Sequence, residues 1–428
     1  MSPSATKDFQ VAIVGGGIVG LTLAIALQRE GIPVQIYEAA EAFSEVGAAI
    51  GLTPYALEIL RRLNVLPDIL HKVPGRTVPP IYRKADKDNQ PILELTTDDA
   101  SNGIDFQRTV AHRAVVLDAL VKHVDPATVH FSKRATSASV SPNGRPVVHF
   151  QDGTSVETDV LIGTDGIRSK VRPYVTGTEE SPVKFSNATS YRGLVASETL
   201  KAAGVKLDVE KRPQILIGKG KHFILVPFNE GKMVNVAAIA TDRSAPFGER
   251  LPLGGKWLID ANHDEIIEQV SEYGPESDLF KVMQLLNGPN KLPIHLLYPV
   301  LESYARGRVA LAGDSAHAML PFLASGASVG IEDAYLLAQI LSHPKVNKSN
   351  VESALQLYSR LRVPRDTEVW QASSAAGDVF QGYGPAGDTP AGIREDIQKL
   401  LEGDYKRYAQ GFDQGVGIAA ALAALEQK

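Results

Sequence analysis

The sequence predicts an α/β protein in which a domain built on a parallel sheet is interrupted by a second domain built on an antiparallel sheet. Three short apolar segments carry the first part of this prediction: FQVAIVG at 9–15, TDVLIG at 158–163 and RVALAG at 308–313. Each precedes a glycine-bearing turn and a stretch with helical spacing. Unbroken runs of Val, Ile and Leu are typical of strands buried on both faces of a parallel sheet, and the repeated strand, turn and helix indicates an α/β fold.

The region between the second and third of these segments predicts the antiparallel sheet. It contains QILIG, HFILVPF and MVNVAAIA, separated by the turn signals GKGK and NEGK. Short strands joined by such turns are typical of hairpins. The polar stretch RKADKDNQP at 83–91 is expected to form a hairpin or excursion of the same domain.

These patterns divide the chain into six segments. We assign 1–75, 105–182 and 300–375 to the first domain, 76–104 and 183–299 to the inserted domain, and 376–428 to a helical C-terminal region. Helical spacing after residue 350 is expected to break at Pro364, because proline removes a helical hydrogen bond. The glycine-rich 377–392 is expected to be a loop.

Composition excludes several functions. The net charge is −5, from 44 basic and 49 acidic residues without a long basic run, so nucleic acid is not an expected partner. The absence of cysteine excludes disulfides and thiolate chemistry. No His and carboxylate cluster has metal-ligand spacing, so no metal is predicted. Without a signal-peptide pattern or an apolar run of membrane-spanning length, we expect a cytoplasmic protein with no membrane contact, either monomer or homodimer.

A dinucleotide cradle follows the first strand. Gly15, Gly17 and Gly20 have the G-x-G-x-x-G spacing and open a helical segment, and a second strand ends at Glu38. The first glycine permits a tight turn, the second lets a pyrophosphate approach the backbone, and the third lets helix and strand pack closely. Glu38 can accept hydrogen bonds from an unmodified adenosine ribose, so the cradle favours FAD or NAD.

The other two strand and turn units resemble one enzyme family. TDVLIGTDGIRSKVR places Asp165 and Gly166 after a strand, with a basic helix expected next, and RVALAGDSAHAMLP places Asp314 after another. Together with the cradle, in this order, they resemble the FAD-dependent aromatic hydroxylases, the single-component flavoprotein monooxygenases that include salicylate hydroxylase and the fungal phenol dearomatases. The resemblance covers nearly the whole chain and implies a Rossmann-type FAD-binding domain with an inserted substrate domain.

The resemblance also implies roles for individual residues. The cradle would hold the ADP half of FAD, Asp314 would accept a hydrogen bond from the ribityl chain, and the Asp165 turn would lie near FAD and the nicotinamide approach. Gly326 and Ala327 would let a helix N-terminus approach the flavin and stabilise negative charge there. The predicted cofactor-binding residues are Gly15, Gly17, Ile18, Val19, Gly20, Glu38, Ala39, Gly51, Arg113, Asp165, Asp314, Gly326 and Ala327.

In such a family NADH or NADPH reduces the flavin, and O₂ then forms a C4a-hydroperoxide that an electron-rich ring attacks. The resemblance therefore implies hydroxylation of a phenolic or aromatic acid, and few catalytic side chains are needed. Arg192, in TSYRGLVAS, matches an arginine that holds the substrate phenolate in the phenol dearomatases. A fixed guanidinium would favour the ionised phenol, so Arg192 is the predicted catalytic residue.

The expected substrate pocket has fewer polar groups than in related enzymes. Val226 stands where the dearomatases carry a Tyr, Gly51 where some relatives carry a His, and Phe322 where many carry a His after the proline of the third motif. The predicted pocket residues are Arg192, Val226, Pro321 and Phe322, with Arg192 as the main charged anchor.

Two other enzyme classes are set aside, and one alternative function remains open. A disulfide reductase is excluded because it needs a redox dithiol and the chain has no cysteine. A halogenase is not expected because it carries a Trp-x-Trp signature, which Trp257 and Trp370 do not form. An NAD(P)H oxidase or a non-hydroxylating flavoprotein is the alternative kept, because the pocket lacks polar groups. His317 is expected to pack beneath the flavin loop; His112, His222 and His295 are interpreted as structural.

Overall fold

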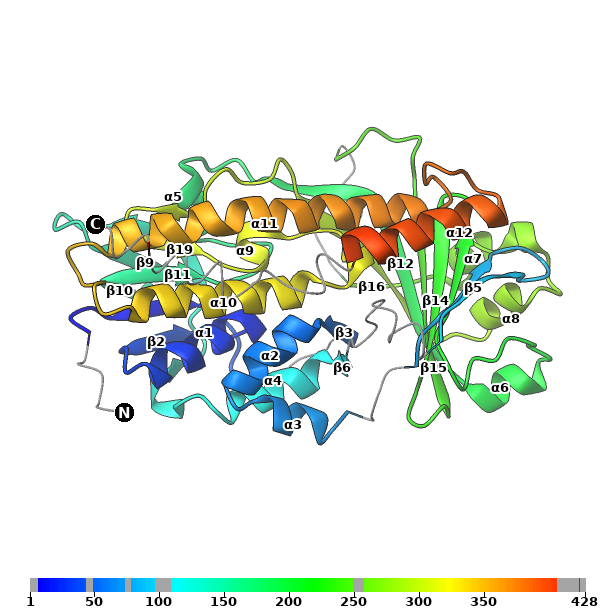
Figure 1. Cartoon of the computed structure of the whole chain (residues 1–428), viewed down its shortest axis with the longest axis horizontal. Helices are drawn as coiled ribbons and strands as arrows, with labels where there is room; N and C mark the ends of the chain where they lie inside the picture. Colours follow the sequence, from blue (N-terminus) through cyan, green and yellow to red (C-terminus); the bar gives the residue numbers. More distant parts are fainter. Residues whose placement is uncertain are drawn as a thin grey trace.

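The computed structural model describes residues 7–43, 49–73, 78–96, 109–248 and 258–405, together with residue 423. It contains two main sheets, with a long helix running beside both (Figure 1). The predicted fold class is confirmed: a mixed α/β domain with a parallel sheet, an inserted sheet domain and a helical C-terminal region.

The first sheet has six strands in the order β18-β19-β11-β1-β2-β7. All neighbours are parallel except the β18–β19 hairpin. The three apolar segments of the sequence form β1, β11 and β19, which are buried along their whole length. The strands are β1 (Val11–Val14), β2 (Val34–Tyr37), β7 (Val129–His130), β11 (Val160–Gly163), β18 (Ala305–Arg306) and β19 (Val309–Leu311).

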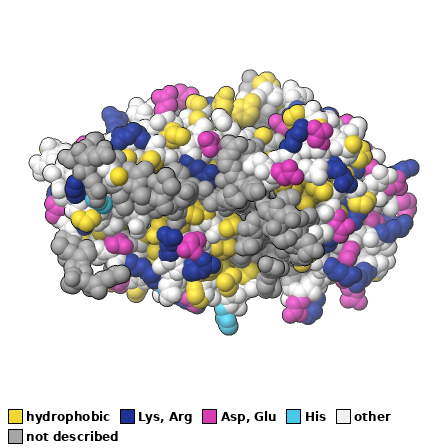
Figure 2. All heavy atoms as spheres, in the orientation of Figure 1, with side chains coloured by type: hydrophobic (Ala, Val, Ile, Leu, Met, Phe, Trp, Pro, Cys, Tyr) yellow, Lys and Arg dark blue, Asp and Glu magenta, His cyan; other side chains and the backbone are white. Residues whose placement is uncertain are grey.

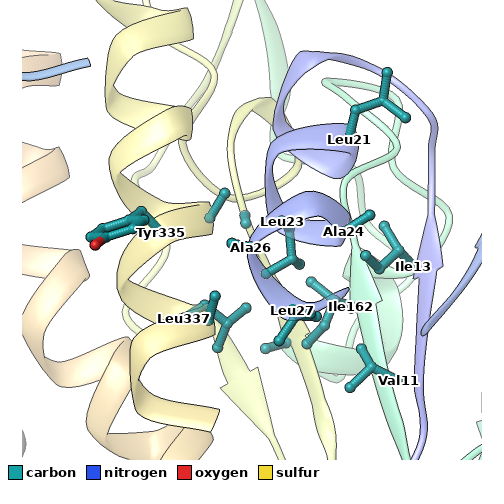
Figure 3. Packing of buried hydrophobic residues seen from close by; sticks show 14 of the residues in the cluster. Val11, Ile13, Leu21, Leu23, Ala24, Ala26, Leu27, Ile162, Tyr335 and Leu337 are labelled. Atoms are coloured by element: carbon teal, nitrogen blue, oxygen red, sulfur yellow. The ribbon is translucent and has the colours of Figure 1, made fainter. Parts of the chain in front are cut away.

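Helix α1 (Ile18–Arg29) is packed between this sheet and α10 (Gly326–Ser342). Both are apolar on most sides, as expected of helices enclosed by other elements. Figure 3 shows α1 carrying Leu23, Ala26 and Leu27 into this layer, with Leu337 on α10 and Ile162 on β11 among the neighbours. These contacts hold the start of α10 near the start of α1.

Smaller elements surround this domain. A separate antiparallel sheet consists of β8 (Ala135–Val140), β9 (Pro146–Phe150) and β10 (Ser155–Glu157), and a two-stranded one of β3 (Ala49–Leu52) and β6 (Thr109–His112). The remaining helices here are α2 (Pro54–Arg62), α3 (Leu66–Leu70), α4 (Arg113–Val121), α5 (Arg172–Thr176) and α9 (Asp314–His317), with 3-10 turns at Pro126–Thr128 and Pro321–Leu323.

The second sheet has eight strands in the order β16-β17-β12-β15-β14-β13-β4-β5. It is antiparallel apart from the parallel pair β13–β4. Because β4 and β5 come from the polar excursion, residues far apart in sequence share this sheet. The strands are β4 (Ile81–Lys84), β5 (Pro91–Glu94), β12 (Val183–Ala196), β13 (Gln214–Gly218), β14 (Lys221–Phe228), β15 (Met233–Thr241), β16 (Ile259–Asp260) and β17 (Asn287–Leu297).

The two faces of this sheet have different covers. One face packs against α7 (His263–Glu268) and α8 (Asp278–Gln284), with α6 (Ser197–Ala202) and the 3-10 turn Ser271–Tyr273 nearby. The other faces α11 (Val351–Phe380), α12 (Pro390–Lys399) and the turn that carries Phe322. A π-helical segment, Leu400–Tyr405, follows α12 directly. The second face is therefore the one turned toward the third motif.

Three local predictions differ from the structure. Helix α11 continues through Pro364, so the expected break there is wrong. Pro364 and Arg360 are both exposed, so the Arg360 carbonyl that loses its helical donor can bond to water. The loop expected at 377–392 spans only 381–389, because Gly377 packs inside α11 against the Phe322 ring and α12 already begins at Pro390. The basic helix expected after Gly166 begins only at Arg172.

The outer surface carries both basic and acidic side chains, as the nearly balanced composition of the sequence predicts. On the face shown in Figure 2, the described basic and acidic side chains are interspersed. Among the described residues, no helix combines the length and apolar character needed to cross a lipid bilayer.

Candidate functional site

The predicted cofactor residues lie at one edge of the six-stranded sheet. Gly15 follows β1, Glu38 follows β2, Asp165 lies after β11 and Asp314 after β19. Since these four strands are parallel, their carboxyl ends meet at the same edge. Open α/β sheets bind their ligands at this edge.

The three fingerprint glycines have different surroundings. Gly15 has φ +107, and a Cβ there would lie 2.5 Å from the Thr164 carbonyl oxygen. A Cβ on Gly20 would lie 2.0 Å from the Gly15 oxygen, whereas one on Gly17 would meet no atom within 4 Å. Gly15 and Gly20 therefore permit the turn and the close packing of α1. Gly17 leaves bare backbone at the N-terminus of α1, where no side chain caps the helix.

Thr164 holds this turn from the neighbouring strand, and the sequence analysis missed it. Its hydroxyl is buried and lies 2.9 Å from the Val14 oxygen and 2.8 Å from the Gly15 oxygen. It follows β11 directly, so pairing of β1 with β11 places it beside the glycine turn. A hydroxyl in TDVLIGT carries no pattern of its own that would have indicated this contact.

Glu38 connects two parts of the cradle. One carboxylate oxygen accepts a hydrogen bond from the Gly16 backbone N–H at 2.6 Å, and the other accepts one from Ala40 at 2.8 Å. The carboxylate therefore lies directly beside the glycine turn. Ala39 lies between these contacts, half-buried, in the turn after β2.

Asp165 is bonded mainly within its own loop. One carboxylate oxygen accepts a hydrogen bond from the Lys170 N–H at 2.6 Å, while the other is buried without a partner among the described residues. Burial raises the pKa of the Asp165 carboxyl. Gly166 follows with φ +75 and completes the turn.

The third motif joins the turn after β19 to the start of α10. Gly313 has φ +67, and a Cβ there or on Gly330 would collide with Val19 of α1. Asp314 is exposed, and within the described chain its carboxylate makes no hydrogen bond. A Cβ on Gly326 would lie 4.0 Å from that carboxylate. Close packing thus places Asp314 beside the uncapped first turn of α10, where Gly326 and Ala327 lie.

Gly51 and Arg113 lie on the other side of this helix start. Gly51 belongs to β3 and is paired with Val110 of β6, which leads into α4, where Arg113 is the first residue and is exposed. Ser328 of α10 connects the two regions: its hydroxyl donates to the Gly51 oxygen at 3.1 Å and accepts from the Thr53 N–H at 3.0 Å. The sequence analysis did not identify Ser328.

The arrangement suits an extended dinucleotide such as FAD. Gly17 leaves backbone open at a helix N-terminus, the kind of position where phosphates bind, and the Glu38 carboxylate lies beside it. Asp314 is a carboxylate with no protein partner in the described chain. Ile18 and Val19 begin α1, where Ile18 is buried and Val19 packs against Gly313. Their backbone N–H groups lie in the uncapped first turn of α1, and their contact with the cofactor stays a prediction.

Arg192 lies on the face of the second sheet that is turned toward the third motif. On β12 it is opposite Ala237, which is in turn opposite Ile224 of β14, and directly opposed residues share a face. Its Nε donates to the Ser190 hydroxyl at 3.1 Å, and no described carboxylate lies within 4.0 Å. Burial lowers the pKa of the Arg192 guanidinium. This cation is thus partly desolvated without a counter-ion in the described chain.

The other predicted pocket residues lie around the same face. Val226 is opposite Asn235, one row beyond Arg192, so both share a face of the sheet. Pro321 begins the 3-10 turn that carries Phe322, and Phe322 packs near Ile239, Ile294 and Leu320. The structure therefore brings Arg192, Val226 and Phe322 to one side of the sheet.

His222 is the residue that the sequence analysis undervalued. It lies on β14 opposite Ile239, in the row next to Arg192, and is only 1% exposed. Its ring contacts Phe322 and Phe380, with centroids 5.4 and 5.9 Å apart. Neither ring nitrogen has a partner among the described residues. Burial lowers its pKa to about 3, so the imidazole is neutral at neutral pH.

The other three histidines named in the sequence analysis have protein partners. His112 caps α4 by accepting from the Ala114 N–H at 3.4 Å, and His295 Nδ1 lies 3.0 Å from the Pro293 oxygen. His317 is fully enclosed, with Nε2 2.6 Å from Asp333. The alternation of inward and outward residues along β14 would have indicated that His222 faces inward. It would not have indicated that the ring nitrogens of His222 lack a hydrogen-bond partner among the described residues.

Comparison with known proteins identifies the family. The model of the family described as "FAD binding domain" matches residues 8–197 and 290–373. The chain is 34% identical over 389 residues to salicylate hydroxylase of Pseudomonas putida, covering 87% of this chain and 85% of that protein. It is 30% identical over 390 residues to 3-amino-4-hydroxybenzoate 2-monooxygenase PtnB3 of Streptomyces platensis, covering 89% and 90%.

A solved structure agrees with this assignment. A salicylate hydroxylase substrate complex superposes with a TM-score of 0.83 and 25% identity, covering 96% of this chain and 98% of that one. The glycine cradle, the Asp314 turn and the inserted sheet thus occur in a chain whose relatives carry the same architecture. The protein belongs to the FAD-dependent monooxygenases of the salicylate hydroxylase family.

Proposed function

We propose that this protein hydroxylates a phenolic or aromatic-acid substrate, with NADH or NADPH as electron donor and O₂ as co-substrate. The observation that carries the proposal is Arg192, a partly buried cation without a carboxylate partner in the described chain. A buried charge without a partner is costly. A phenolate or carboxylate bound at this face would supply the missing counter-ion.

The chain's own groups then have defined tasks. Bound FAD supplies the electron and oxygen-transfer chemistry. Arg192 binds the anionic group of the substrate and favours the ionised form of a phenol, which makes the ring more reactive. Phe322 and Ile239 provide an apolar surface that orients the ring and excludes water.

His222 is assigned to the same site. As a neutral imidazole beside Phe322, it can donate one hydrogen bond or accept one, and it has no described protein partner for either. A hydroxyl or carbonyl substituent on the substrate would meet this need. The proposal therefore favours a ring with an anionic group toward Arg192 and a second polar substituent toward His222.

The test measures oxidation of NADH and NADPH with three groups of aromatics: phenols, benzoates and hydroxybenzoates. Product masses and peroxide are recorded in parallel. We expect one group to stimulate oxidation and to gain one oxygen atom. Peroxide without an oxygenated product, whatever the aromatic, would instead support the alternative of an NAD(P)H oxidase.

Arg192→Gln provides the residue-specific arm. Loss of the cation should weaken substrate binding by about tenfold or more, while FAD remains bound. The matched control is Arg394→Gln, because Arg394 is exposed on α12 and has no described ionic partner. Equal substrate affinity in both variants would remove Arg192 from the mechanism.

A further inference from the structure

A buried charge cluster lies behind the Asp314 turn. We define it as His317 of α9, Glu332 and Asp333 of α10, and Arg362 and Asp366 of α11. All five are at most 4% exposed. Such a cluster is costly to bury unless its charges are paired. The cluster lies next to the edge of the six-stranded sheet that carries the predicted cofactor residues, and this position points to a task beyond packing.

Arg362 joins the three carboxylates. Its guanidinium contacts Asp333 and Asp366 at 2.6 Å each and Glu332 at 3.1 Å. The ligand atoms of His317, Asp333 and Asp366 lie within 4.8 Å of one another, a spacing that a metal ion could use. The guanidinium already bonds to both Asp side chains, so an ion network rather than a metal accounts for this geometry.

Asp333 also holds the turn that precedes Asp314. Its Oδ2 accepts a hydrogen bond from the Gly313 backbone N–H at 2.8 Å and lies 2.6 Å from His317 Nε2. Gly313 has φ +67, a conformation that glycine adopts without strain but is not confined to, so this hydrogen bond holds the turn in one of the many conformations open to a glycine. The same helix that carries Asp333 begins at Gly326, beside Asp314. One carboxylate therefore ties the turn to α10.

We propose that one part of the buried charge cluster is a positioning device for FAD: Asp333, held by His317 and Arg362, fixes the Gly313–Asp314 turn relative to the first turn of α10. This rests on the proposed FAD contact of Asp314. Asp333 and His317 are positioning residues, because they act through the backbone of Gly313.

Asp366 is a natural control for Asp333. It is equally buried and contacts the same Arg362, but its oxygen lies 3.7 Å from His317 and it has no bond to Gly313. A purely structural cluster would respond similarly when either carboxyl group is replaced by an amide. A positioning cluster should respond at the FAD site only to Asp333.

The test compares Asp333→Asn and Asp366→Asn by titrating apoprotein with FAD and recording flavin fluorescence and visible circular dichroism. We expect Asp333→Asn to weaken FAD affinity by about tenfold or more and to change the flavin spectrum. Asp366→Asn should lower the melting temperature while leaving affinity within about threefold. Equal effects of the two variants on affinity and spectrum would overturn the proposal.

A second pair of variants, His317→Gln and His317→Leu, tests the positioning role if Asp333→Asn does not fold. In His317→Gln an amide N–H can replace the Nε2 donor, whereas His317→Leu provides none. We expect the glutamine variant to keep the wild-type flavin spectrum and affinity, and the leucine variant to lose both. Equivalent behaviour of these variants would contradict the positioning role.

Asp314→Asn separates this inference from the proposed cofactor contact. If Asp314→Asn leaves FAD affinity unchanged, the contact itself is wrong and the inference falls with it. If Asp314→Asn weakens binding while the Asp333 and His317 variants do not, only the positioning role is wrong. If Asp314→Asn and Asp333→Asn each weaken FAD binding, the variant that carries both changes should lose less binding free energy than the sum of the two single losses, because Asp333 acts through the Asp314 turn.

Discussion

The Phe322 ring meets the His222 ring edge-on, with centroids 5.4 Å apart. This contact joins the third motif of the FAD-binding domain to a strand of the inserted domain. It also places an imidazole that has no hydrogen-bond partner among the described residues against the residue that the sequence predicts for the pocket wall. The proposed substrate site is therefore lined from both domains.

The first prediction concerns this imidazole. His222→Leu should weaken binding of the polar aromatic substrate by about tenfold, because a hydrogen bond to the ring substituent is lost. FAD affinity should not change. Substrate titration of the oxidised flavoprotein measures both. His149→Leu, on the separate β9 strand, is the control; if it reduces substrate affinity equally, His222 has no special role.

The second prediction is the acid sensitivity that His222 causes. Its pKa falls from the ordinary 6.5 to about 3 because it is buried. Below pH 6.5 the unfolded chain takes up this proton and the folded chain does not, so stability falls as the pH drops from about 6.5 toward 3. Urea melts at pH 5 and pH 7 should show a smaller difference for His222→Leu than for the wild type. An unchanged difference would argue that His222 is not kept neutral by burial.

The third prediction separates the two roles of the fingerprint glycines. Gly20→Ala should destabilise the apoprotein by about 1–3 kcal/mol, because its Cβ would meet the Gly15 oxygen at 2.0 Å. Gly17→Ala should leave the apoprotein melting temperature nearly unchanged but weaken FAD binding, since its Cβ enters open space above the cradle. Calorimetry and FAD titration test the pair. Unchanged FAD affinity in a folded Gly17→Ala protein would place the pyrophosphate elsewhere.

The fourth prediction concerns Gly377 in α11. A Cβ there would lie 2.5 Å from the Phe322 ring, so Gly377→Ala should displace that ring and alter the preference among substituted aromatics. The destabilisation should be about 1–3 kcal/mol. Gly403→Ala is the control, because its Cβ meets nothing within 4 Å. Ratios of kcat/KM for two substrates of different size report the change, and identical ratios in Gly377→Ala and wild type would contradict it.

The fifth prediction concerns alkaline pH. Burial opposes the charge on His317, but Asp333 and Asp366 outweigh it and raise the pKa of His317 from 6.5 to about 9. This stabilisation is fully present below pH 6.5 and is lost as the pH rises through about 9. Burial raises the pKa of Asp366 and adds to the same trend, while Asp333 stays ionised because its pKa is lowered. Arg362, Glu332 and the high-pKa phenols Tyr304 and Tyr358 complete the surroundings.

Melting temperatures measured between pH 7 and 9 test this effect. The wild type should lose stability over this range, and the part that His317 contributes should be about 3 kcal/mol at most. His317→Gln, which cannot titrate, should lose less. A pH slope as steep in the variant as in the wild type would show that His317 is not the source.

The sequence predicted features that depend on local pattern. The apolar strands and the glycine spacing were sufficient for β1, β11 and β19 and for the turn at Gly15, because burial and backbone conformation restrict the residues allowed there. It failed at Pro364 and Gly377, where contacts from other segments override local propensity. A helix interrupted by a proline can still form when both of its halves are packed.

The candidate site shows the same division. Glu38 and Asp314 follow strands directly, so their positions could be inferred from the order of elements. Thr164, Ser328 and His222 depend on which strands become neighbours and which side chains find a partner. Neither property can be predicted from the spacing of residues within a single segment.

Helix α11 fixes the distance between two parts of the molecule. Arg362, in the buried charge cluster, and Gly377, against Phe322, lie on this one continuous element. At 1.5 Å per residue they are about 22 Å apart along its axis. The distance between the buried charge cluster and the Phe322 contact is thus set by the number of residues between them. Inserting or deleting one residue would also rotate the two ends relative to each other by about 100°.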